Sequence, residues 1–469
     1  MESTIKFGTD GWRSRMDTDF TTGNVRRVAA AIADYLISKK GDRIFIGYDG
    51  RRNSHEFAVA CAEVIGGRGI ECLLPQRAIP TPIAAFAAVN LSLSGAIMIT
   101  ASHNPAAYNG IKFIPYYGGP ASTDITSAIE ALVPERAPAF EPFESLRRNG
   151  VVSEWDPIGA YTDHVRGLLN VGADELKRME IAVDSMHGAT TGIIDRILEE
   201  MGVHVRTVSV GIDPLFGGIV PDPVPDHLAR LKDVTLQGLP LGVALDGDGD
   251  RLAVVTEKGD FLMANQLLPL LYLHMMERKA MPGDAARTVA TSHLTDRVAE
   301  GHGRKVIEVP VGFKYIGSLL REKKVIIGGE ESGGISIVTH IPEKDAIASA
   351  LFVIEAITMS GAPISKLIED IYEKYGYLVS SRTDLTLDKS LPFKLREPDP
   401  DARINGKKIE AVNRLDGTKL ILEDGSWLLL RKSGTENVVR IYAESSNSSD
   451  TEILLRYGKG LVLGSGSSS

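Results

Sequence analysis

Residues 96–105 read Ala-Ile-Met-Ile-Thr-Ala-Ser-His-Asn-Pro, an apolar run that stops at a polar turn containing proline. This pattern predicts a buried strand that ends in a loop. The loop brings Ser102 beside His103, and a serine held at a strand end next to a histidine is a candidate nucleophile. A Ser-His pair by itself is more commonly an ordinary turn, so its meaning depends on what the rest of the chain supplies.

Other short apolar runs also end in polar residues. They cover residues 43–48, 180–183, 241–245 and 324–327. Helical patterns alternate with these runs, which predicts parallel sheets covered by helices. Polar residues past the carboxyl ends of such strands lie where open α/β sheets bind ligands. The recurrence indicates related βαβ units in the first three quarters of the chain.

The length of 469 residues is too great for a single core and predicts three or four domains. Segment 134–155, rich in proline and charge, indicates the first connection between domains. Further boundaries are expected just after Arg251 and near residues 375–377, beyond which short strands indicate a smaller α+β domain. The expected domains are residues 1–150, 151–252, 253–374 and 375–463, followed by a flexible Gly-Ser tail at residues 464–469.

The composition is that of a soluble globular protein, with 43% hydrophobic and 24% charged residues. A net charge of −9 argues against nucleic acid or an anionic membrane as a partner. The two cysteines, Cys61 and Cys72, make no disulfide framework and fit a reducing compartment. The first residues lack a secretory pattern and no apolar run is long enough to span a bilayer, so we expect a cytoplasmic protein.

Three carboxylates alternate with glycines in Asp246-Gly247-Asp248-Gly249-Asp250-Arg251. Alternate side chains of an extended loop can turn toward one point, and oxygen ligands suit a hard cation such as Mg²⁺. A calcium EF-hand loop is the nearest alternative, because Glu257 falls at the twelfth position. Arg251 excludes that alternative, since it occupies the sixth position, where the calcium loop needs glycine. Crowded carboxylates repel one another without a cation, which makes a plain acidic turn the less favoured interpretation.

Glycine-rich loops with polar residues occur at three other places. Residues 328–334, Gly-Gly-Glu-Glu-Ser-Gly-Gly, offer carboxylates and a hydroxyl to a sugar, although a plain turn is an equal alternative. Residues 431–437, Arg-Lys-Ser-Gly-Thr-Glu-Asn, can cradle a phosphate, with a hairpin turn as the alternative. Residues 7–13, Phe-Gly-Thr-Asp-Gly-Trp-Arg, form the third loop. The sequence contains no Walker pattern, so nucleoside triphosphate chemistry is not indicated.

Taken in chain order, these motifs resemble those of the α-D-phosphohexomutase superfamily, which includes phosphoglucomutases, phosphomannomutases and phosphoglucosamine mutases. The similarity runs from residues 7–13 to residues 431–437 and so covers nearly the whole chain. Thr-Ala-Ser-His-Asn-Pro and Asp-Gly-Asp-Gly-Asp-Arg are its most specific motifs. The resemblance implies an α/β fold of four domains around a central cleft. Three would be related α/β domains with mixed sheets, and the fourth a smaller C-terminal α+β domain.

The resemblance also implies roles for individual residues. Ser102 would carry a phosphoryl group, and with the three aspartates of the acidic loop it would hold one Mg²⁺ per chain. Glu330 and Ser332 would read sugar hydroxyls. The other matches are Arg13, Lys112 and Arg251 at the phosphoryl-transfer site, Phe313 and Lys314 at the substrate, and Arg431, Ser433, Gly434 and Thr435 around the phosphate that is not reacting.

In such an enzyme, phosphoserine donates its phosphoryl group to a hexose monophosphate, and the resulting 1,6-bisphosphate returns its other phosphoryl group to Ser102. Mg²⁺ and cationic side chains neutralise charge on the transferring oxygens. The reaction also needs a general acid/base. His103, Lys112 and Lys344 are the candidates, and the sequence leaves all three open.

Two positions depart from the motifs of mannose- and glucosamine-handling relatives. Gly334 and Phe313 stand where those relatives have histidine. Both favour glucose phosphates, so we expect a phosphoglucomutase that interconverts glucose 1-phosphate and glucose 6-phosphate, with glucose 1,6-bisphosphate as activator. A phosphomannomutase or dual-specificity enzyme is the alternative, and a metal-dependent sugar phosphatase or a non-catalytic phosphosugar-binding protein is less favoured. We expect a hexose phosphate as the substrate, and a monomer or homodimer.

Overall fold

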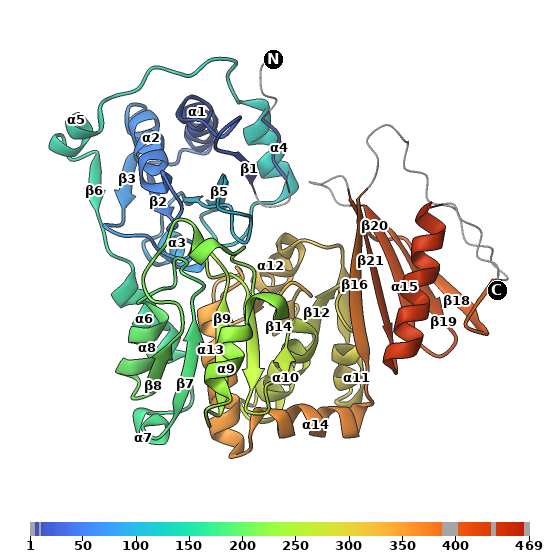
Figure 1. Ribbon diagram of the computed structural model, residues 1–469. Helices are drawn as coiled ribbons and strands as arrows, with labels where there is room; N and C mark the ends of the chain where they lie inside the picture. Colours follow the sequence, from blue (N-terminus) through green and yellow to red (C-terminus); the bar gives the residue numbers. More distant parts are fainter. Residues whose placement is uncertain (1–4, 9–10, 387–401, 433–437, 464–469) are drawn as a thin grey trace.

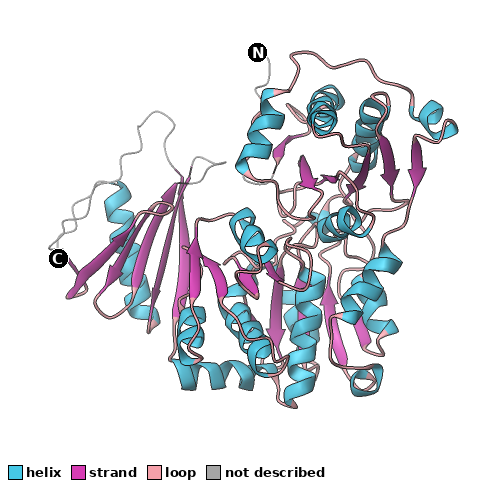
Figure 2. Cartoon of the chain, turned by 180° about the vertical axis from the view of Figure 1, so that it is seen from behind, coloured by secondary structure: helices cyan, strands magenta, loops and turns pink. Residues whose placement is uncertain are grey.

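The computed structural model describes residues 5–8, 11–386, 402–432 and 438–463. Four sheets follow one another along the chain, and Figure 1 shows them as four units, with the fourth at one side of the molecule. Helices lie on both sides of the first three sheets, whereas the fourth sheet carries a helix on one side (Figure 2). The chain is therefore an α/β protein of three layered units followed by a smaller α+β unit.

The first unit holds a six-stranded sheet in the order β1-β5-β4-β2-β3-β6. Its elements are β1 (Trp12–Arg15), α1 (Thr22–Ser38), β2 (Arg43–Tyr48), α2 (Ser54–Gly66), β3 (Glu71–Leu74), α3 (Thr81–Asn90), β4 (Gly95–Ile99), β5 (Tyr108–Pro115), α4 (Thr123–Ala131), α5 (Phe143–Arg148) and β6 (Val152–Glu154).

The second unit holds a five-stranded sheet in the order β11-β10-β9-β7-β8. Its elements are α6 (Ile158–Gly167), α7 (Ala173–Leu176), β7 (Glu180–Asp184), α8 (Ile194–Glu200), β8 (His204–Thr207), the short helices η1 (Phe216–Gly218) and η2 (Pro225–His227), α9 (Ala229–Thr235), β9 (Leu241–Leu245), β10 (Leu252–Thr256) and β11 (Phe261–Leu262).

The third unit holds a four-stranded sheet in the order β13-β12-β14-β15. Its elements are α10 (Ala264–Glu277), β12 (Ala285–Thr288), α11 (Leu294–Gly301), β13 (Val306–Val309), α12 (Phe313–Arg321), β14 (Ile327–Gly329), β15 (Ile335–Ile337), α13 (Ala346–Ser360) and α14 (Ile364–Tyr375).

The fourth unit holds an antiparallel sheet in the order β16-β21-β20-β19-β18-β17. Its elements are β16 (Val379–Thr386), β17 (Arg403–Ile404), β18 (Lys407–Asn413), β19 (Thr418–Leu422), β20 (Trp427–Lys432), β21 (Val438–Ser445) and α15 (Ser448–Leu463).

The first three sheets share one strand pattern. Three parallel strands, β3-β2-β4 in the first sheet, are extended by an antiparallel strand that returns as a hairpin, here β5. The same pattern recurs as β8-β7-β9 with β10, and as β13-β12-β14 with β15. The expected related units in the first three quarters of the chain are thus visible in the topology. Each hairpin loop occupies the equivalent place in its sheet.

Alternate residues of the central strands face two separate apolar layers. In β4, Ala96 and Met98 belong to one cluster, and Ile97 and Ile99 belong to the other. Helices cover both faces, so the strands are apolar throughout rather than alternately polar. This explains why the uninterrupted apolar runs in the sequence predicted strands rather than amphipathic helices.

One apolar cluster runs through all three units and includes Ala84 of α3, Val183 of β7 and Ile347 of α13. Because the units share this core, their hairpin loops are held in fixed positions relative to one another. No single helix in the described ranges is long and apolar enough to cross a membrane, and α13 and α14 meet that test only as a pair bent by 82°.

Three strands, β6, β10 and β11, fall outside the domain limits expected from the sequence. β10 begins directly after Arg251 and pairs with β9, so the second sheet continues to Leu262 instead of ending at residue 252. β6 pairs with β3 and adds residues 152–154 to the first sheet, beyond the expected limit at residue 150. A polar loop marks a turn inside a sheet as readily as a boundary between domains, which is why both limits were misplaced.

The strand expected at residues 324–327 is also shifted, because β14 covers Ile327–Gly329. Its two glycines pair with β12, and a side chain on Gly328 would overlap Ile316 of α12. Glycine is therefore required inside this strand by the close packing of a helix.

Candidate active site

Three hairpin loops meet at one place in the molecule. They are residues 100–107 after β4, residues 246–251 after β9 and residues 330–334 after β14. The hydroxyl of Ser102 donates to Asp246 Oδ2 at 3.0 Å, which joins the first loop to the second. The backbone N–H of Leu252 donates to the carbonyl of Gly333 at 3.1 Å, which joins the second loop to the third. Equivalent positions of three related sheets thus form a single site.

Ser102 lies in a buried and constrained part of its loop. Its φ is 51°, a left-handed conformation that is uncommon for serine, and 1% of the residue is exposed. The backbone N–H donates to Thr100 Oγ1 at 2.9 Å, and the hydroxyl oxygen lies 3.3 Å from His103 Nδ1. Strained backbone that is fixed by its surroundings is concentrated at functional sites. The geometry therefore agrees with a functional serine.

Arg51, which was not among the predicted site residues, supports the serine loop. Its guanidinium donates to four backbone carbonyls between Ser102 and Tyr108 and pairs with Asp49 Oδ2 at 3.1 Å. Both side chains of this ion pair are fully buried. The signal in the sequence is the Asp-Gly-Arg triplet after β2, where the polar residues could be noticed but not their target.

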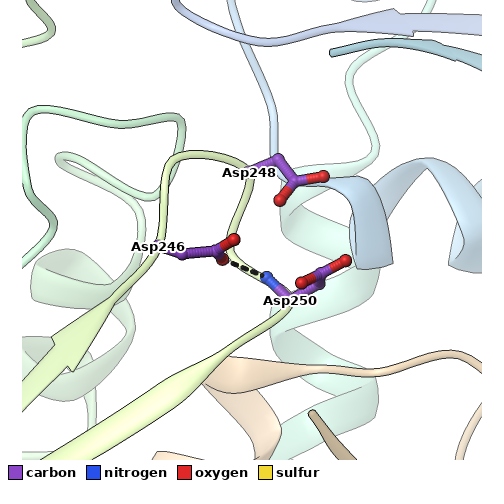
Figure 3. A group of neighbouring side chains, drawn as sticks. All are labelled: Asp246, Asp248 and Asp250. Carbon is purple, nitrogen blue, oxygen red and sulfur yellow. Dashed lines mark hydrogen bonds between the residues drawn. The ribbon is translucent and has the colours of Figure 1, made fainter. Parts of the chain in front are cut away.

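The three aspartates of the acidic loop are buried and lie close together. One carboxylate oxygen from each of Asp246, Asp248 and Asp250 falls within 4.8 Å of the others. The backbone N–H of Asp250 donates to Asp246 Oδ1 at 2.8 Å and closes the turn (Figure 3). A side chain on Gly247 would collide with the carbonyl oxygen of Ser102, so the interleaved glycine permits the serine loop to approach.

One oxygen of Asp248 and one oxygen of Asp250 already bind other side chains. Asp248 Oδ2 accepts from Thr81 Oγ1 at 2.6 Å and from Lys112 Nζ at 3.0 Å, and Asp250 Oδ2 lies 3.1 Å from Lys344 Nζ. Thr81 and its bond to Asp248 were not foreseen, and no motif in the sequence indicates them. Lys112 also contacts Asp250 Oδ2 at 3.3 Å.

The other oxygens of Asp248 and Asp250 fit a cation. Oδ1 of Asp248 and Oδ1 of Asp250 are buried and have no hydrogen-bond partner among the described residues. A buried carboxylate oxygen without a partner carries a large desolvation cost, which a bound cation offsets. An all-oxygen donor set is the one that hard divalent cations prefer. The predicted metal ligands are therefore together in space and able to hold such an ion.

The surroundings shift the pKa values of these carboxyls in opposite directions. Burial and then repulsion by the other two aspartates raise the pKa of Asp246 well above its ordinary value. Burial acts in the same direction on Asp250, but neighbouring cations, Lys344 first, outweigh it and lower its pKa. A positive ion among the three would therefore favour the ionised form of Asp246.

The surroundings of His103 disfavour its charged form. Burial, followed by the charges of Arg251 and Arg13, places its pKa well below the ordinary value. Arg251 NH2 lies 3.4 Å from His103 Nε2, and because a guanidinium only donates, Nε2 is the acceptor. The ring proton is then on Nδ1, which faces the oxygen of Ser102.

Two further predicted arginines lie beside the serine loop and the acidic loop. Arg13 donates to Asn104 Oδ1 of the serine loop at 3.1 Å, and Arg251 donates to Asp222 Oδ1 at 3.1 Å. With Lys112 and Lys344, they place four cationic side chains around the serine and the acidic loop. Asp222 was not predicted, since its Pro-Asp-Pro context reads as an ordinary turn.

The predicted sugar loop lies beside this cluster. Glu330 is 6% exposed, and its Oε1 accepts from the backbone N–H of Gly312 at 2.9 Å. Burial raises its pKa, although Lys344 opposes the change. Phe313, buried at the start of α12, lies with its ring 6.0 Å from Lys344 Nζ. Ser332 lies on the same loop and is half-buried.

Gly334 has a structural reason for being glycine. A methyl group built on its Cα would overlap the side-chain stem of Lys344. The lysine thus occupies the space that a histidine at this position would need. The absence of histidine at position 334 and the presence of Lys344 at the site are therefore explained by the same packing contact.

The remaining predicted substrate residues are only partly described. Lys314 Nζ donates to Thr123 Oγ1 of α4 at 2.9 Å, a contact between the third unit and the first. Arg431, near the end of β20, donates from Nε to Asp416 Oδ2 at 2.7 Å. Ser433, Gly434 and Thr435 lie outside the described residues.

Comparison with known families accounts for all four units. Residues 4–139, 159–259 and 263–375 match the phosphoglucomutase/phosphomannomutase alpha/beta/alpha domains I, II and III, respectively. Residues 393–454 match the phosphoglucomutase/phosphomannomutase C-terminal domain. The four matches follow one another in family order.

Individual relatives match over nearly the full chain. A phosphoglucomutase/phosphomannomutase from Thermococcus kodakarensis is 28% identical over 457 residues, which cover 96% of this chain and 97% of the relative. A protein from Methanothermobacter thermautotrophicus named as a probable phosphoglucosamine mutase is 30% identical over 469 residues, covering 96% and 95%.

A solved structure from Thermus thermophilus that carries a phosphomannomutase name superposes with a TM-score of 0.88. It is 32% identical, and the match covers 99% of this chain and 100% of that one. The relatives carry different substrate names, so they agree on the reaction type and not on the sugar. The chain belongs to the α-D-phosphohexomutase superfamily and is a phosphosugar mutase of the isomerase class.

Proposed function

We propose that this protein is a Mg²⁺-dependent phosphoglucomutase that interconverts glucose 1-phosphate and glucose 6-phosphate through a phosphorylated Ser102. The observation that carries the proposal is the Ser102 hydroxyl, which lies 3.0 Å from Asp246 Oδ2 of an acidic loop whose other carboxylates pair with Lys112 and Lys344. Catalysis of phosphoryl transfer consists mainly of positioning and of neutralising charge. The Lys344 side chain fills the space beside Gly334 that the histidine of the mannose and glucosamine motifs would need, and this supports glucose as the sugar.

Ser102 carries the phosphoryl group between the two halves of the reaction. When that group leaves, negative charge grows on Ser102 Oγ, and the Nδ1–H of His103 at 3.3 Å stabilises it by donating a hydrogen bond. Asp246, Asp248 and Asp250 would hold Mg²⁺, which would supply further neutralisation of charge on the transferring oxygens.

The three acid/base candidates have different surroundings. Lys112 is paired with Asp248 and Asp250, and Lys344 is paired with Asp250, so both are suited to act as cations beside the phosphoryl group. His103 faces the serine oxygen itself. We assign to His103 the stabilisation of that oxygen and to the lysines the stabilisation of phosphoryl charge. The proton that leaves the attacking sugar hydroxyl ends on Ser102 Oγ, and it returns to the sugar oxygen when Ser102 is phosphorylated again.

Substrate binding uses the two remaining loops. Glu330 accepts hydrogen bonds from sugar hydroxyls, and Ser332 donates to them. The phosphate that does not react is bound by Arg431 with Ser433, Gly434 and Thr435. The 1,6-bisphosphate then turns within the site and presents its other phosphate to Ser102. This two-way exchange requires both phosphate positions to be bound at once.

A coupled assay tests the proposal. Purified protein with Mg²⁺ and a trace of glucose 1,6-bisphosphate is expected to convert glucose 1-phosphate into glucose 6-phosphate. The intact mass should rise by one phosphoryl group, mapped to Ser102, and Ser102→Ala should lose both the mass change and the turnover. Phosphorylated protein that turns over no hexose phosphate would refute the proposal, and steady release of inorganic phosphate equal to substrate loss would indicate a phosphatase.

Mannose 1-phosphate is the second candidate substrate. The similarity to the Thermus structure that carries a phosphomannomutase name favours testing it. Specificity is the ratio of kcat/KM values, and a difference in one hydroxyl is read chiefly by buried polar groups such as Glu330. We expect glucose 1-phosphate to have the highest kcat/KM, followed by mannose 1-phosphate, with glucosamine 1-phosphate measured alongside. A higher value for mannose 1-phosphate would reverse the assignment.

A further inference from the structure

A hydrogen bond joins the fourth unit directly to the sugar loop. The hydroxyl of Tyr442, on β21, donates to Glu331 Oε1 at 3.2 Å. Glu331 lies between the two residues proposed to read the sugar, Glu330 and Ser332. Its other carboxylate oxygen accepts from Thr288 Oγ1, at the end of β12, at 3.5 Å. Glu331 is therefore held between the third unit and the fourth.

Tyr442 is fixed firmly enough to position its partner. It is 3% exposed and packs in an apolar cluster with Trp427 and Leu429 of the fourth sheet and with Val289 and Ala290 of the third unit. Burial, followed by the charge of Glu331, raises the pKa of Tyr442, so its hydroxyl stays protonated and donates. The ring is anchored in the contact between units, and only its hydroxyl reaches the sugar loop.

A second contact leads from the predicted phosphate site to the same loop. Asp416 Oδ2 accepts from Arg431 Nε at 2.7 Å and from the backbone N–H of Val311 at 2.9 Å. The next residue, Gly312, donates its N–H to Glu330 Oε1 at 2.9 Å. One carboxylate thus holds a phosphate-binding arginine and also the segment that orients the sugar-reading glutamate.

The two contacts reach adjacent residues of one loop. The first runs from Tyr442 to Glu331, and the second runs from Arg431 through Asp416 and the backbone at 311–312 to Glu330. β20 and β21, which supply Arg431 and Tyr442, flank residues 433–437 of the predicted phosphate loop. The position of the fourth unit is therefore tied to the orientation of the sugar-reading side chains.

We propose that Tyr442 and Asp416 are positioning residues that couple phosphate binding by Arg431 of the fourth unit to recognition of sugar hydroxyls by Glu330. The proposal rests on the proposed function, and it assigns roles to two residues that belong to neither binding loop. Such coupling suits an enzyme whose bisphosphate intermediate turns around in the site. The fourth unit then holds first one phosphate and then the other, and Glu330 must be placed correctly for the sugar hydroxyls in both orientations.

Tyr442→Phe tests the first contact, since it removes one hydroxyl and keeps the buried ring. We expect kcat/KM for glucose 1-phosphate to fall about tenfold, the effect of losing one hydrogen bond to a charged group. The inhibition constant of inorganic phosphate, which has no sugar hydroxyl to be read, should remain unchanged. Tyr377→Phe removes a hydroxyl from a tyrosine that is 53% exposed and should leave both quantities at wild-type values.

Variants of Glu331, which accepts the hydrogen bond from Tyr442, distinguish a positioning role of this bond from a general effect on the structure. Glu331→Gln keeps an oxygen that can accept from Tyr442 and should retain most activity, whereas Glu331→Ala should behave like Tyr442→Phe. The double variant Tyr442→Phe/Glu331→Ala should be no worse than either single variant, because both remove the same bond. Asp416→Ala should weaken the binding of inorganic phosphate as well as sugar recognition, since it removes the oxygen that accepts from both Arg431 and the backbone of Val311.

Calorimetric titration with glucose 6-phosphate and with inorganic phosphate tests the positioning role separately from the proposed function, because it measures binding and does not require turnover. The proposal predicts that Tyr442→Phe weakens binding of the sugar phosphate and not of phosphate, whether or not the wild type turns over glucose phosphates. Equal affinities in wild type and variant would overturn it, as would a parallel loss for both ligands. An inactive wild type that still shows the differential binding would refute only the glucose reaction.

Discussion

The backbone of Gly334 lies directly against the side-chain stem of Lys344, with no room for even a methyl group on the glycine. Lys344 Nζ reaches Asp250 Oδ2 at 3.1 Å and is 10% exposed as a side chain. A residue of the sugar loop therefore limits the space open to a lysine that pairs with the acidic loop. This contact links the identity of position 334 to the charge balance around Ser102.

Gly334→Ala is expected to displace Lys344 and to lower kcat by about tenfold or more, because an overpacked buried site forces side chains from their preferred positions. Gly334→His should have a larger effect. The assay is mutase activity with the thermal midpoint measured in parallel. Gly159→Ala is the matched control, since that glycine has open space around its Cα. Full activity in Gly334→Ala would show that Lys344 has no fixed role.

Removal of the predicted metal should affect stability as well as activity. Mg²⁺ bound to the native chain alone raises stability by about 3 kcal/mol at a concentration of 100 times its Kd. Chelation is therefore expected to lower the unfolding midpoint, and Asp248→Asn should weaken binding at least tenfold by calorimetric titration. Asp260→Asn changes an exposed aspartate in the next hairpin turn and should bind as the wild type does. Unaltered Mg²⁺ affinity in Asp248→Asn would contradict the assignment of the ligands.

Arg51→Lys should cost activity even though the charge is kept. A lysine cannot reproduce the planar set of donors by which Arg51 binds four carbonyls of the serine loop. We expect kcat to fall at least tenfold, with rapid-quench measurement of Ser102 phosphorylation showing where the loss occurs. Arg52→Lys, at the exposed neighbouring position, serves as the control. Comparable activity in the two variants would mean that the loop holds its shape without Arg51.

Lys419 makes stability depend on alkaline pH. Burial, then repulsion by Arg287, lowers its pKa from 10.5 to about 8, although Glu308 lies 2.8 Å away. The folded chain therefore binds fewer protons than the unfolded chain between pH 8 and 10.5. As the pH rises through that window, the free energy of unfolding contributed by this group increases, and it is lowest below pH 8. The full effect is about 3 kcal/mol.

The measurement compares the thermal midpoints of the wild type and Lys419→Met from pH 7 to pH 10. The thermal midpoint of the wild type should increase relative to that of Lys419→Met as the pH rises above 8. Below pH 8 the difference between the two midpoints should be nearly constant. Lys366→Met alters an exposed lysine and should show no such trend. Parallel pH profiles for wild type and Lys419→Met would disprove the shift.

Much of this site could be predicted from local sequence because its chemistry is concentrated in short loops. Ser102 and the three aspartates follow buried apolar strands, and interleaved glycines mark loops that approach one another closely. The residues that support these loops could not be predicted. Arg51 and Thr81 act through partners that are 51 to 167 positions away, and no spacing rule connects such pairs.

The sequence by itself determined the fold class, the apolar strands and the identities of the reactive groups, because these depend on periodicity and on the chemistry of single residues. Only the tertiary structure decided which groups meet. The core shared by three related sheets brings equivalent hairpin loops together, so that Ser102 faces Asp246 across 144 positions. The same packing brought Lys344 against Gly334, and Tyr442 to Glu331, through contacts that exist only once the sheets are assembled.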